Sequence, residues 1–288
     1  MSGNHGNSDY WVVKLDAAGG IVWQKALGGS GVDVATALTA SPDGGYIVVG
    51  YTQSTDGDVS GNHGNSDYWV VKLDAAGGIV WQKALGGTGY DEAKVITASG
   101  DGGFVVAGFT YSTDGDVSGN HGNSDYWVVK LDSLGSIVWQ KALGGTGYDI
   151  ANALTASDDG GFVVAGFTES NNGDVAENQG NADYWVVRLD SLGGIVWQKA
   201  LGGTDYDDAF AITASDDGGF VVAGFTESND GDVSGNHGNA DYWVVRLSAT
   251  APTVSDLSAP ARACSSPPRW AISQAPTTTR SPTGRAAP

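Results

Sequence analysis

The sequence repeats itself with a fixed period of 58 residues, and this period constrains the fold more than any other feature. The string DYWVVKLD begins at Asp9, and close copies follow at equal intervals. These copies begin at Asp67, Asp125, Asp183 and Asp241. Residues 9–29 and 67–87 are identical. A fixed long period indicates that each copy is one supersecondary unit, which buries its apolar faces against its neighbours.

Each repeat contains four segments with the composition of β-strands. In the first copy they are residues 10–15, 21–27, 37–40 and 46–52, which are rich in aromatic, aliphatic and β-branched residues. Glycine-containing turns such as Asp43-Gly44-Gly45 separate them. Four short antiparallel strands per repeat predict an all-β fold, a β-propeller of four-stranded blades. A β-solenoid is the alternative, but its coils are usually nearer to ~20 residues.

Residue size predicts the order of strands within a blade. The strand with small side chains (residues 37–40) suits the crowded centre, and the Trp-bearing strand (residues 79–85) suits the outer edge. Trp81 would then be buried between adjacent blades. The repeats supply two strands, three complete blades and three further strands, about four blade equivalents. Sixteen of these 17 strands would close a four-blade ring by joining the two ends of the repeat region in one blade.

The repeats and the C-terminal segment differ in composition. We expect a repeat domain over residues 1–248, with units 9–66, 67–124, 125–182 and 183–240 and a partial strand at 241–247. Residues 249–288 hold seven of the eight prolines and the only cysteine, and this Pro-, Ala-, Ser- and Arg-rich composition predicts disorder. Met1 stands where the next copy has Val59, which suggests a piece of a longer array.

The net charge limits the classes of partner. Lys and Arg number 14 against 33 Asp and Glu, which gives a formal net charge of -19. Repulsion from a polyanion argues against nucleic acid as a ligand. No apolar run reaches the roughly 18 residues of a membrane helix, so no membrane insertion is expected. The first ten residues lack the basic start and apolar stretch of a signal peptide.

The repeat motifs resemble a known family. The strings DYWVVKLD, IVWQKALGG and DGGFVVAGFT, with the D-x-A motif between the last two, are similar to the bacterial SBBP-type β-propeller repeat. The resemblance covers residues 2–247 and recurs four times. It implies a propeller in a secreted or cell-surface protein. It implies no shared catalytic residues and no particular ligand.

The polar loop before each DYWVVKLD strand has the spacing of a calcium-binding loop. Residues 56–61 followed by Asp67 fit the pattern D-x-[DNS]-x-[DNS]-G-x5-[DE], with oxygen ligands at positions 1, 3, 5 and 12. The predicted ligands are Asp56, Asp58, Ser60 and Asp67, then Asp114, Asp116, Ser118 and Asp125, and finally Asp230, Asp232, Ser234 and Asp241. The remaining copy, with Ala176 and Glu177, lacks one ligand and the glycine. Solvated polar turns without calcium are the alternative.

Two other glycine motifs are interpreted as fold elements. Residues 28–35 match the first part of a calcium-binding nonapeptide, but one copy per 58 residues indicates a loop from one blade's outer strand to the next blade's inner strand. Ser41-x-Asp43-x-Gly45 resembles the Asp-box of sialidase propellers, which ties a hairpin turn. The motif is therefore expected to stabilise a turn.

Aromatic residues recur at fixed positions. Nine tryptophans occupy two positions of the repeat: Trp11, Trp69, Trp127, Trp185 and Trp243, and Trp23, Trp81, Trp139 and Trp197. Large aromatics at repeating strand positions are typical of packing between blades. Sugar stacking by the Tyr10 and Trp11 positions is the alternative. The four histidines are expected to be solvated loop residues rather than zinc ligands.

Near-identical repeats favour binding over catalysis. A catalytic centre needs a single constellation of residues in different roles, and no one-off polar residue stands out in the channel strands. Equivalent sites add through avidity. The sequence therefore predicts a non-enzymatic scaffold for multivalent binding or adhesion, with a glycan or protein ligand and with calcium as a candidate cofactor. The resemblance to the SBBP-type repeat implies that its setting is extracellular or the cell surface. The alternative is a propeller enzyme or quinoprotein-like domain whose active site lies outside this segment.

Overall fold

The computed structural model describes residues 3–248 and 254–256, and these residues form an all-β structure. The strands are β1 (Tyr10–Leu15), β2 (Ile21–Leu27), β3 (Asp33–Ala40), β4 (Tyr46–Thr52), β5 (Asp67–Leu73), β6 (Ile79–Leu85), β7 (Asp91–Ala98), β8 (Phe104–Thr110), β9 (Asp125–Leu131), β10 (Ile137–Leu143), β11 (Asp149–Ala156), β12 (Phe162–Thr168), β13 (Asp183–Leu189), β14 (Ile195–Leu201), β15 (Asp207–Ala214), β16 (Phe220–Thr226), β17 (Asp241–Leu247) and β18 (Val254–Asp256). Within these residues no helix is long and apolar enough to cross a membrane.

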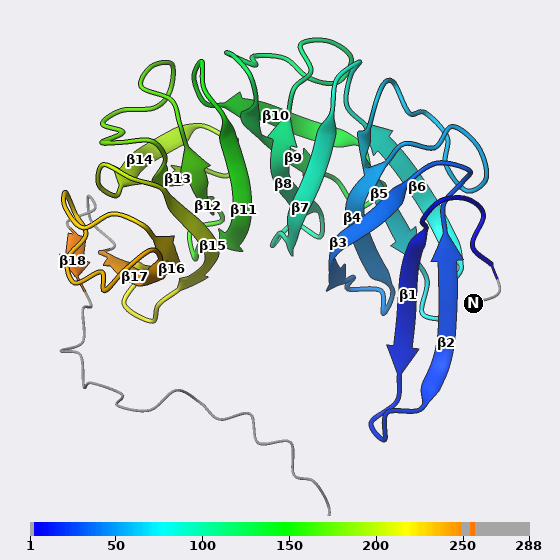
Figure 1. The fold of residues 1–288 in the computed structure, drawn as a ribbon. Coiled ribbons are helices and arrows are strands. Elements are labelled where there is room, and N and C mark those ends of the chain that lie inside the picture. Colours follow the sequence, from blue (N-terminus) through cyan, green and yellow to red (C-terminus); the bar gives the residue numbers. More distant parts are fainter. Residues whose placement is uncertain (1–2, 249–253, 257–288) are drawn as a thin grey trace, which may run out of the picture. The chain divides into compact units, whose positions relative to one another are not determined.

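The strands form antiparallel sheets in chain order. Strands β3 to β6, β7 to β10, β11 to β14 and β15 to β18 make four-stranded sheets, and β1 and β2 make a two-stranded sheet (Figure 1). The first strands β3, β7, β11 and β15 of successive sheets contact one another. The fold is thus a β-propeller arrangement of four-stranded blades, as the repeat predicts.

The predicted strand order within a blade is confirmed. The small-residue strand is innermost and the Trp-bearing strand is outermost in the blades β3 to β6, β7 to β10 and β11 to β14. The inner strand is longer than predicted, because β3 begins at Asp33 and pairs it with Thr52. A register shift between Ala35 and Ala37 accommodates the extra length.

Close packing between strands fixes the glycine in the second strand of each blade. All seven residues of β8 are buried, because β8 lies between β7 and β9 in a sheet that is covered by other blades. A Cβ added to Gly108 would lie 2.0 Å from the carbonyl oxygen of Glu92. Only glycine fits beside that carbonyl.

The two tryptophan positions differ in how deeply they are buried. Trp69, Trp127 and Trp185 are completely buried, whereas the outer-strand tryptophans Trp23, Trp81, Trp139 and Trp197 are only half-buried. The outer tryptophans do reach the next blade, where the Trp23 indole N–H donates to the Ala75 carbonyl at 3.1 Å. The prediction that they pack between blades is therefore correct, but full burial is wrong. A central strand is covered on both faces, whereas an outer strand has an open edge.

The two ends of the repeat region do not share a blade. Strands β1 and β2 remain a separate sheet, and the last blade takes β18 as its fourth strand, with Val254 opposite Leu247. The expected closure through sixteen repeat strands is therefore not found within the described residues. Strand β18 also lies in the segment expected to be disordered, where it covers part of the edge of β17. The rest of residues 249–288 lies outside the described residues.

Candidate functional site

The two ends of the blades differ in the length of their connections. One end carries tight turns, for example residues 74–78 between β5 and β6, and the other carries the 14-residue loops such as 53–66 between β4 and β5. We call the latter the long-loop end.

The Asp-box-like turn lies at the tight-turn end and is confirmed as a fold element, since Asp43 accepts from the Gly45 amide at 3.2 Å and pairs with Lys72 at 2.6 Å. The Lys72 hydrogen bond is the main cause that lowers the pKa of Asp43 to about 2.

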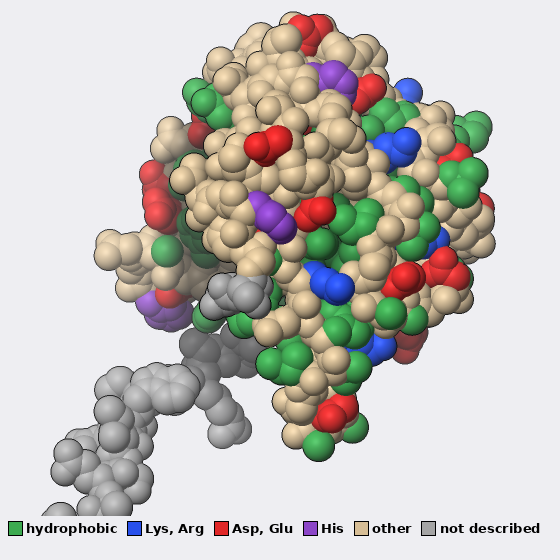
Figure 2. Space-filling model, turned by 90° about the vertical axis from the view of Figure 1, so that its right-hand side faces the viewer, with side chains coloured by type: hydrophobic (Ala, Val, Ile, Leu, Met, Phe, Trp, Pro, Cys, Tyr) green, Lys and Arg blue, Asp and Glu red, His purple; other side chains and the backbone are tan. Residues whose placement is uncertain are grey.

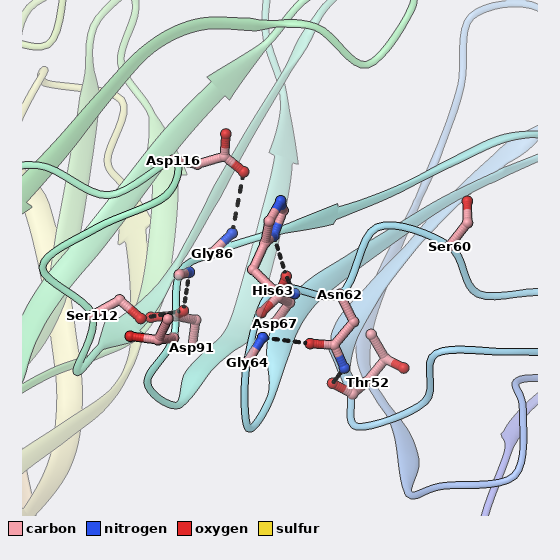
Figure 3. Close-up of polar contacts among 12 residues, drawn as sticks. Thr52, Ser60, Asn62, His63, Gly64, Asp67, Gly86, Asp91, Ser112 and Asp116 are labelled. Carbon is pink, nitrogen blue, oxygen red and sulfur yellow. Dashed lines mark hydrogen bonds and ion pairs between the residues drawn. The ribbon is translucent and has the colours of Figure 1, made fainter.

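At the long-loop end, three carboxylates surround one glycine where two blades meet. The Gly86 amide donates to Asp116 at 3.3 Å, and a Cβ on Gly86 would lie 2.4 Å from Asp91 and 2.9 Å from Asp67 (Figure 3). We call this group the blade junction. Its copies are Asp9, Gly28, Asp33 and Asp58, then Asp125, Gly144, Asp149 and Asp174, and Asp183, Gly202, Asp207 and Asp232. Only glycine leaves room for the carboxylates.

Within the junction, Asp91 anchors the inner strand. Its carboxylate is buried and accepts hydrogen bonds from the Thr110 hydroxyl, from the Ser112 hydroxyl at 2.7 Å and from the Gly87 amide at 2.8 Å. The D-x-A motif therefore ties a blade's first two strands to the preceding glycine loop. That loop does run from an outer strand to the next inner strand, as predicted for residues 28–35.

Asp67 is the carboxylate of this junction that has a buried oxygen without a hydrogen-bond partner among the described residues. Its Oδ2 accepts from the backbone amide of His63 at 3.0 Å and contacts the imidazole Nδ1 at 2.7 Å, whereas its buried Oδ1 has no partner. Burial is the main cause that raises the pKa of Asp67 to about 6, and the contacts with His63 oppose the rise. In the copy where Gln179 replaces the histidine, the pKa of Asp183 rises to about 7. The sequence did not reveal this histidine–aspartate contact.

The predicted calcium ligands of one loop face different partners. Asp56 accepts from the Ser30 amide at 2.7 Å, Asp58 from the Gly28 amide at 3.3 Å, and Ser60 from the Gln82 side chain. Figure 3 shows Ser60 well away from Asp67. The second loop repeats this pattern, with Asp114 bound to Thr88, Asp116 to Gly86, Ser118 to Gln140 and Asp125 to His121.

The predicted ligands of the last loop also contact separate partners, because of the path that the chain takes. Asp230 accepts from the Thr204 amide at 2.8 Å, Asp232 from the Gln179 side chain, and Asp241 contacts His237; Ser234 lies in the same loop. The start of each loop returns to the preceding junction, and the final aspartates Asp67 and Asp125 enter the next one, whereas Asp241 at the end of the last loop contacts His237. Among the described residues no three His, Cys, Asp or Glu side chains form a metal site. The residues of each predicted loop therefore do not fit a calcium cage in this arrangement.

A band of aromatic side chains occupies the long-loop end near the inner strands. It consists of Tyr90, Phe109, Tyr111, Tyr148, Phe167, Tyr206, Phe210 and Phe225, which we call the aromatic band. The Tyr111 ring centroid lies 6.5 Å from that of Tyr90 and 6.3 Å from that of Tyr148. In the last blade the Tyr206 ring stacks on Phe225 at 6.1 Å. These contacts link rings from successive blades.

Polar residues that are not repeated lie beside this band. On the inner strands, position 92 and its equivalents are Val34, Glu92, Ile150 and Asp208, and position 94 and its equivalents are Thr36, Lys94, Asn152 and Phe210. The Asn152 amide donates to Asp208 of the next blade at 2.9 Å. Burial raises the pKa of Asp208 to about 7. The expectation that no one-off polar residue lies on the inner strands is therefore wrong. A comparison of equivalent positions among the repeats would have found these differences.

The repeated aromatic positions are closed to a ligand in the complete blades. Tyr68 and Trp69 are fully buried, and the Tyr68 hydroxyl donates to the Trp127 carbonyl of the next blade at 2.8 Å. Buried rings of this kind stabilise blade packing and have no face left for a sugar. Sugar stacking by this position is therefore wrong for these blades, whereas Tyr90, Tyr111 and Tyr148 of the aromatic band are exposed at the long-loop end.

The chain is similar to parts of known proteins. No family model matches the chain. The chain is 29% identical over 190 residues to the regulatory protein FlaEY of Caulobacter vibrioides, a match that covers 62% of this chain and 20% of that protein. The chain thus spans about a fifth of the length of that relative.

Two solved structures are similar over most of the chain. BamB from Moraxella catarrhalis has 18% identity and a TM-score of 0.40, with 83% of this chain and 54% of BamB covered. Sqt1 from Chaetomium thermophilum has 13% identity and a TM-score of 0.46, with 85% and 52% covered. At this level of similarity we carry no ligand or partner over to this protein.

Proposed function

We propose that the protein is a non-enzymatic repeat scaffold that binds a glycan or protein ligand at the long-loop end of its blades. The aromatic band carries this proposal, because Tyr90, Tyr111 and Tyr148 each expose between 39% and 48% of their surface there. Amphipathic tyrosine rings offer apolar contact and a polar hydroxyl at once, which is the usual chemistry of recognition surfaces. At the opposite end the rings form separate pairs, such as Trp139 with Phe162, and the rings of these pairs are half-buried or buried.

The repeated blades suit multivalent binding. Successive blades hold the same loops at regular intervals, so weak contacts to a repetitive ligand add through avidity. We place this activity in an extracellular or cell-surface setting, with a role in adhesion. The motifs that resemble the SBBP-type repeat support that setting, because the family is found in secreted and cell-surface proteins.

The proposal assigns no catalytic role to the one-off polar residues. Asn152 and Asp208 contribute one amide and one carboxyl group, and the Asn152 amide donates to Asp208 and to the Ala209 carbonyl. General acid and base catalysis requires groups with different tasks around a reacting atom. This pair serves better to hold two inner strands together.

An array of glycans and extracellular proteins, probed with the full chain, tests the proposal. We expect at least one retained ligand, and we expect Tyr148→Ala to weaken its binding by at least about fivefold, because truncation removes a partly exposed aromatic anchor. Tyr242→Ala is the matched control, since Tyr242 is 97% exposed on β17 and lies outside the aromatic band. Wild-type binding by Tyr148→Ala, or no retained ligand at all, would contradict the proposal.

A further inference from the structure

We propose that the aromatic band binds a cationic segment of a partner protein, one rich in lysine or arginine. This inference rests on the proposed function, because it names the ligand class of the same surface. Three features of the band support it: the angles between its rings, the carboxylates around it, and a cation of the protein's own that already lies against it.

The rings around Tyr111 form a corner with accessible faces. The Tyr90 ring plane stands at 79° to that of Tyr111, and the Tyr148 ring plane stands at 64°. In edge-to-face packing of this kind the edge of one ring covers one face of the other and leaves the remaining faces open, and these three side chains are 39% to 48% exposed. The face of an aromatic ring carries negative potential and attracts ammonium and guanidinium groups.

Carboxylates make the potential of the band more negative. Burial raises the pKa of Tyr111, and Tyr148, Glu92 and Glu169 raise it further. Burial likewise raises the pKa of Tyr206 to about 12, with added effects of Asp208, Glu169 and Glu227. Glu169 therefore acts on both groups of rings. A cationic segment gains from the rings and the carboxylates together, whereas a neutral sugar gains nothing from the charge.

The chain itself shows how the band holds a cation. The Lys94 ammonium lies 5.1 Å from the centroid of the Phe109 ring and 3.0 Å from a carboxylate oxygen of Glu92. Within the described residues, the other such contact is between Lys14 and Tyr46 at the tight-turn end. The faces of Tyr90, Tyr111 and Tyr148 thus have no cation of the chain against them in the described part.

The rings and carboxylates of the proposed site lie in the second, third and fourth blades. In the first blade the equivalents of Tyr90, Glu92 and Tyr111 are Val32, Val34 and Gln53, so neither ring nor carboxylate is present there. The proposed site is therefore not a general property of the repeat. Binding of one cationic segment across the second, third and fourth blades follows from this distribution.

Calorimetric titration of the full chain with a short oligolysine peptide tests the inference. We expect binding that weakens as salt is added, because the attraction is partly electrostatic. Tyr111→Leu should weaken it by about threefold to tenfold, whereas Tyr111→Phe keeps the ring and should stay within about twofold. Glu169→Gln should weaken it similarly. Glu177→Gln is the matched control, because it removes the same charge from an exposed position in the same loop.

The outcomes separate this inference from the proposed function. Absence of oligolysine binding, equal binding by Tyr111→Leu, or an equal loss in Glu177→Gln would overturn the cationic ligand. If a neutral oligosaccharide bound instead and Tyr148→Ala abolished that binding, the proposed function would stand and this inference would fall. All substituted side chains are at least partly exposed, and circular dichroism of each variant confirms its fold.

Discussion

Residues 9–29 and 67–87 have the same sequence but lie in different surroundings. Trp11 is 52% exposed and its copy Trp69 is fully buried, and Leu15 is 55% exposed where Leu73 is fully buried. Some contacts are nonetheless shared, because Tyr10 and Tyr68 each donate to a tryptophan carbonyl of the next blade, at 2.9 Å and 2.8 Å. The comparison of these two segments distinguishes the contacts that depend on the segment's own sequence from the burial that depends on neighbouring strands.

The difference comes from the strands on the inner side. Strand β5 pairs with β4 along its whole length, whereas β1 pairs with β2 and has no second partner among the described strands. Figure 2 views the side where β1 and β2 lie and shows hydrophobic side chains at the surface there. Burial in a blade therefore depends on a paired inner strand and a covering neighbour, which teaches that the repeat unit is complete only within the array.

The largest expected effect is on the two tryptophans. Trp69→Ala should lower the free energy of unfolding by about 3–5 kcal/mol, because it leaves a cavity in a fully buried site. Trp11→Ala, the same substitution in the same local sequence, should cost about 1 kcal/mol or less, since half of that side chain is already in water. Urea denaturation of both variants measures the two values. Equal losses would mean that β1 is as well covered in solution as β5.

A smaller effect concerns the pH dependence of the buried carboxylate of β5. Because the pKa of Asp67 is raised from 3.8 to about 6 in the folded state, the unfolded chain releases this proton first, and stability falls as pH rises from about 4 to 6. In Asp67→Asn this contribution is absent. The stability of the variant relative to wild type should therefore increase by about 2 kcal/mol over that interval.

Asp241 provides the control for this pH experiment. It repeats the histidine contact at an exposed site, and hydrogen bonds from His237 lower its pKa. Its stabilising contribution is present above the unfolded pKa and is lost as pH falls. Asp241→Asn should therefore show no relative gain between pH 4 and 6. Parallel stability curves for wild type and Asp67→Asn would refute the raised pKa.

The smallest expected effect is that of calcium on the loops between the two regions. Because Asp56, Asp58, Ser60 and Asp67 face separate partners, we expect millimolar calcium and EDTA to leave the unfolding temperature unchanged within error. Differential scanning calorimetry of wild type and Asp58→Ala measures this. A calcium-dependent rise that disappears in Asp58→Ala would show that the loop rearranges into the predicted cage.

The sequence does not predict which carboxylates of the long-loop end lie together. The calcium-loop spacing groups Asp58 with Asp67, but they belong to consecutive junctions, with Gly28 and Gly86 respectively. Spacing within a loop cannot show this, because Asp67 meets Asp116 through contacts between repeats. Tyr111 and Asp208 are not predicted for another reason: they stand at positions where the repeats differ, and the shared repeat pattern does not include them.

The sequence by itself determined the repeat, the strand order and the turns. In both copies of the identical segment the turn is closed in the same way, with Asp16 accepting from the Ala18 amide and Asp74 from the Ala76 amide, each at 2.8 Å. The tertiary structure alone decided that Trp69 is buried while Trp11 is exposed. A turn is closed by hydrogen bonds within five residues and forms wherever those residues occur. Burial requires other strands to displace water, and the segment's own sequence does not contain them.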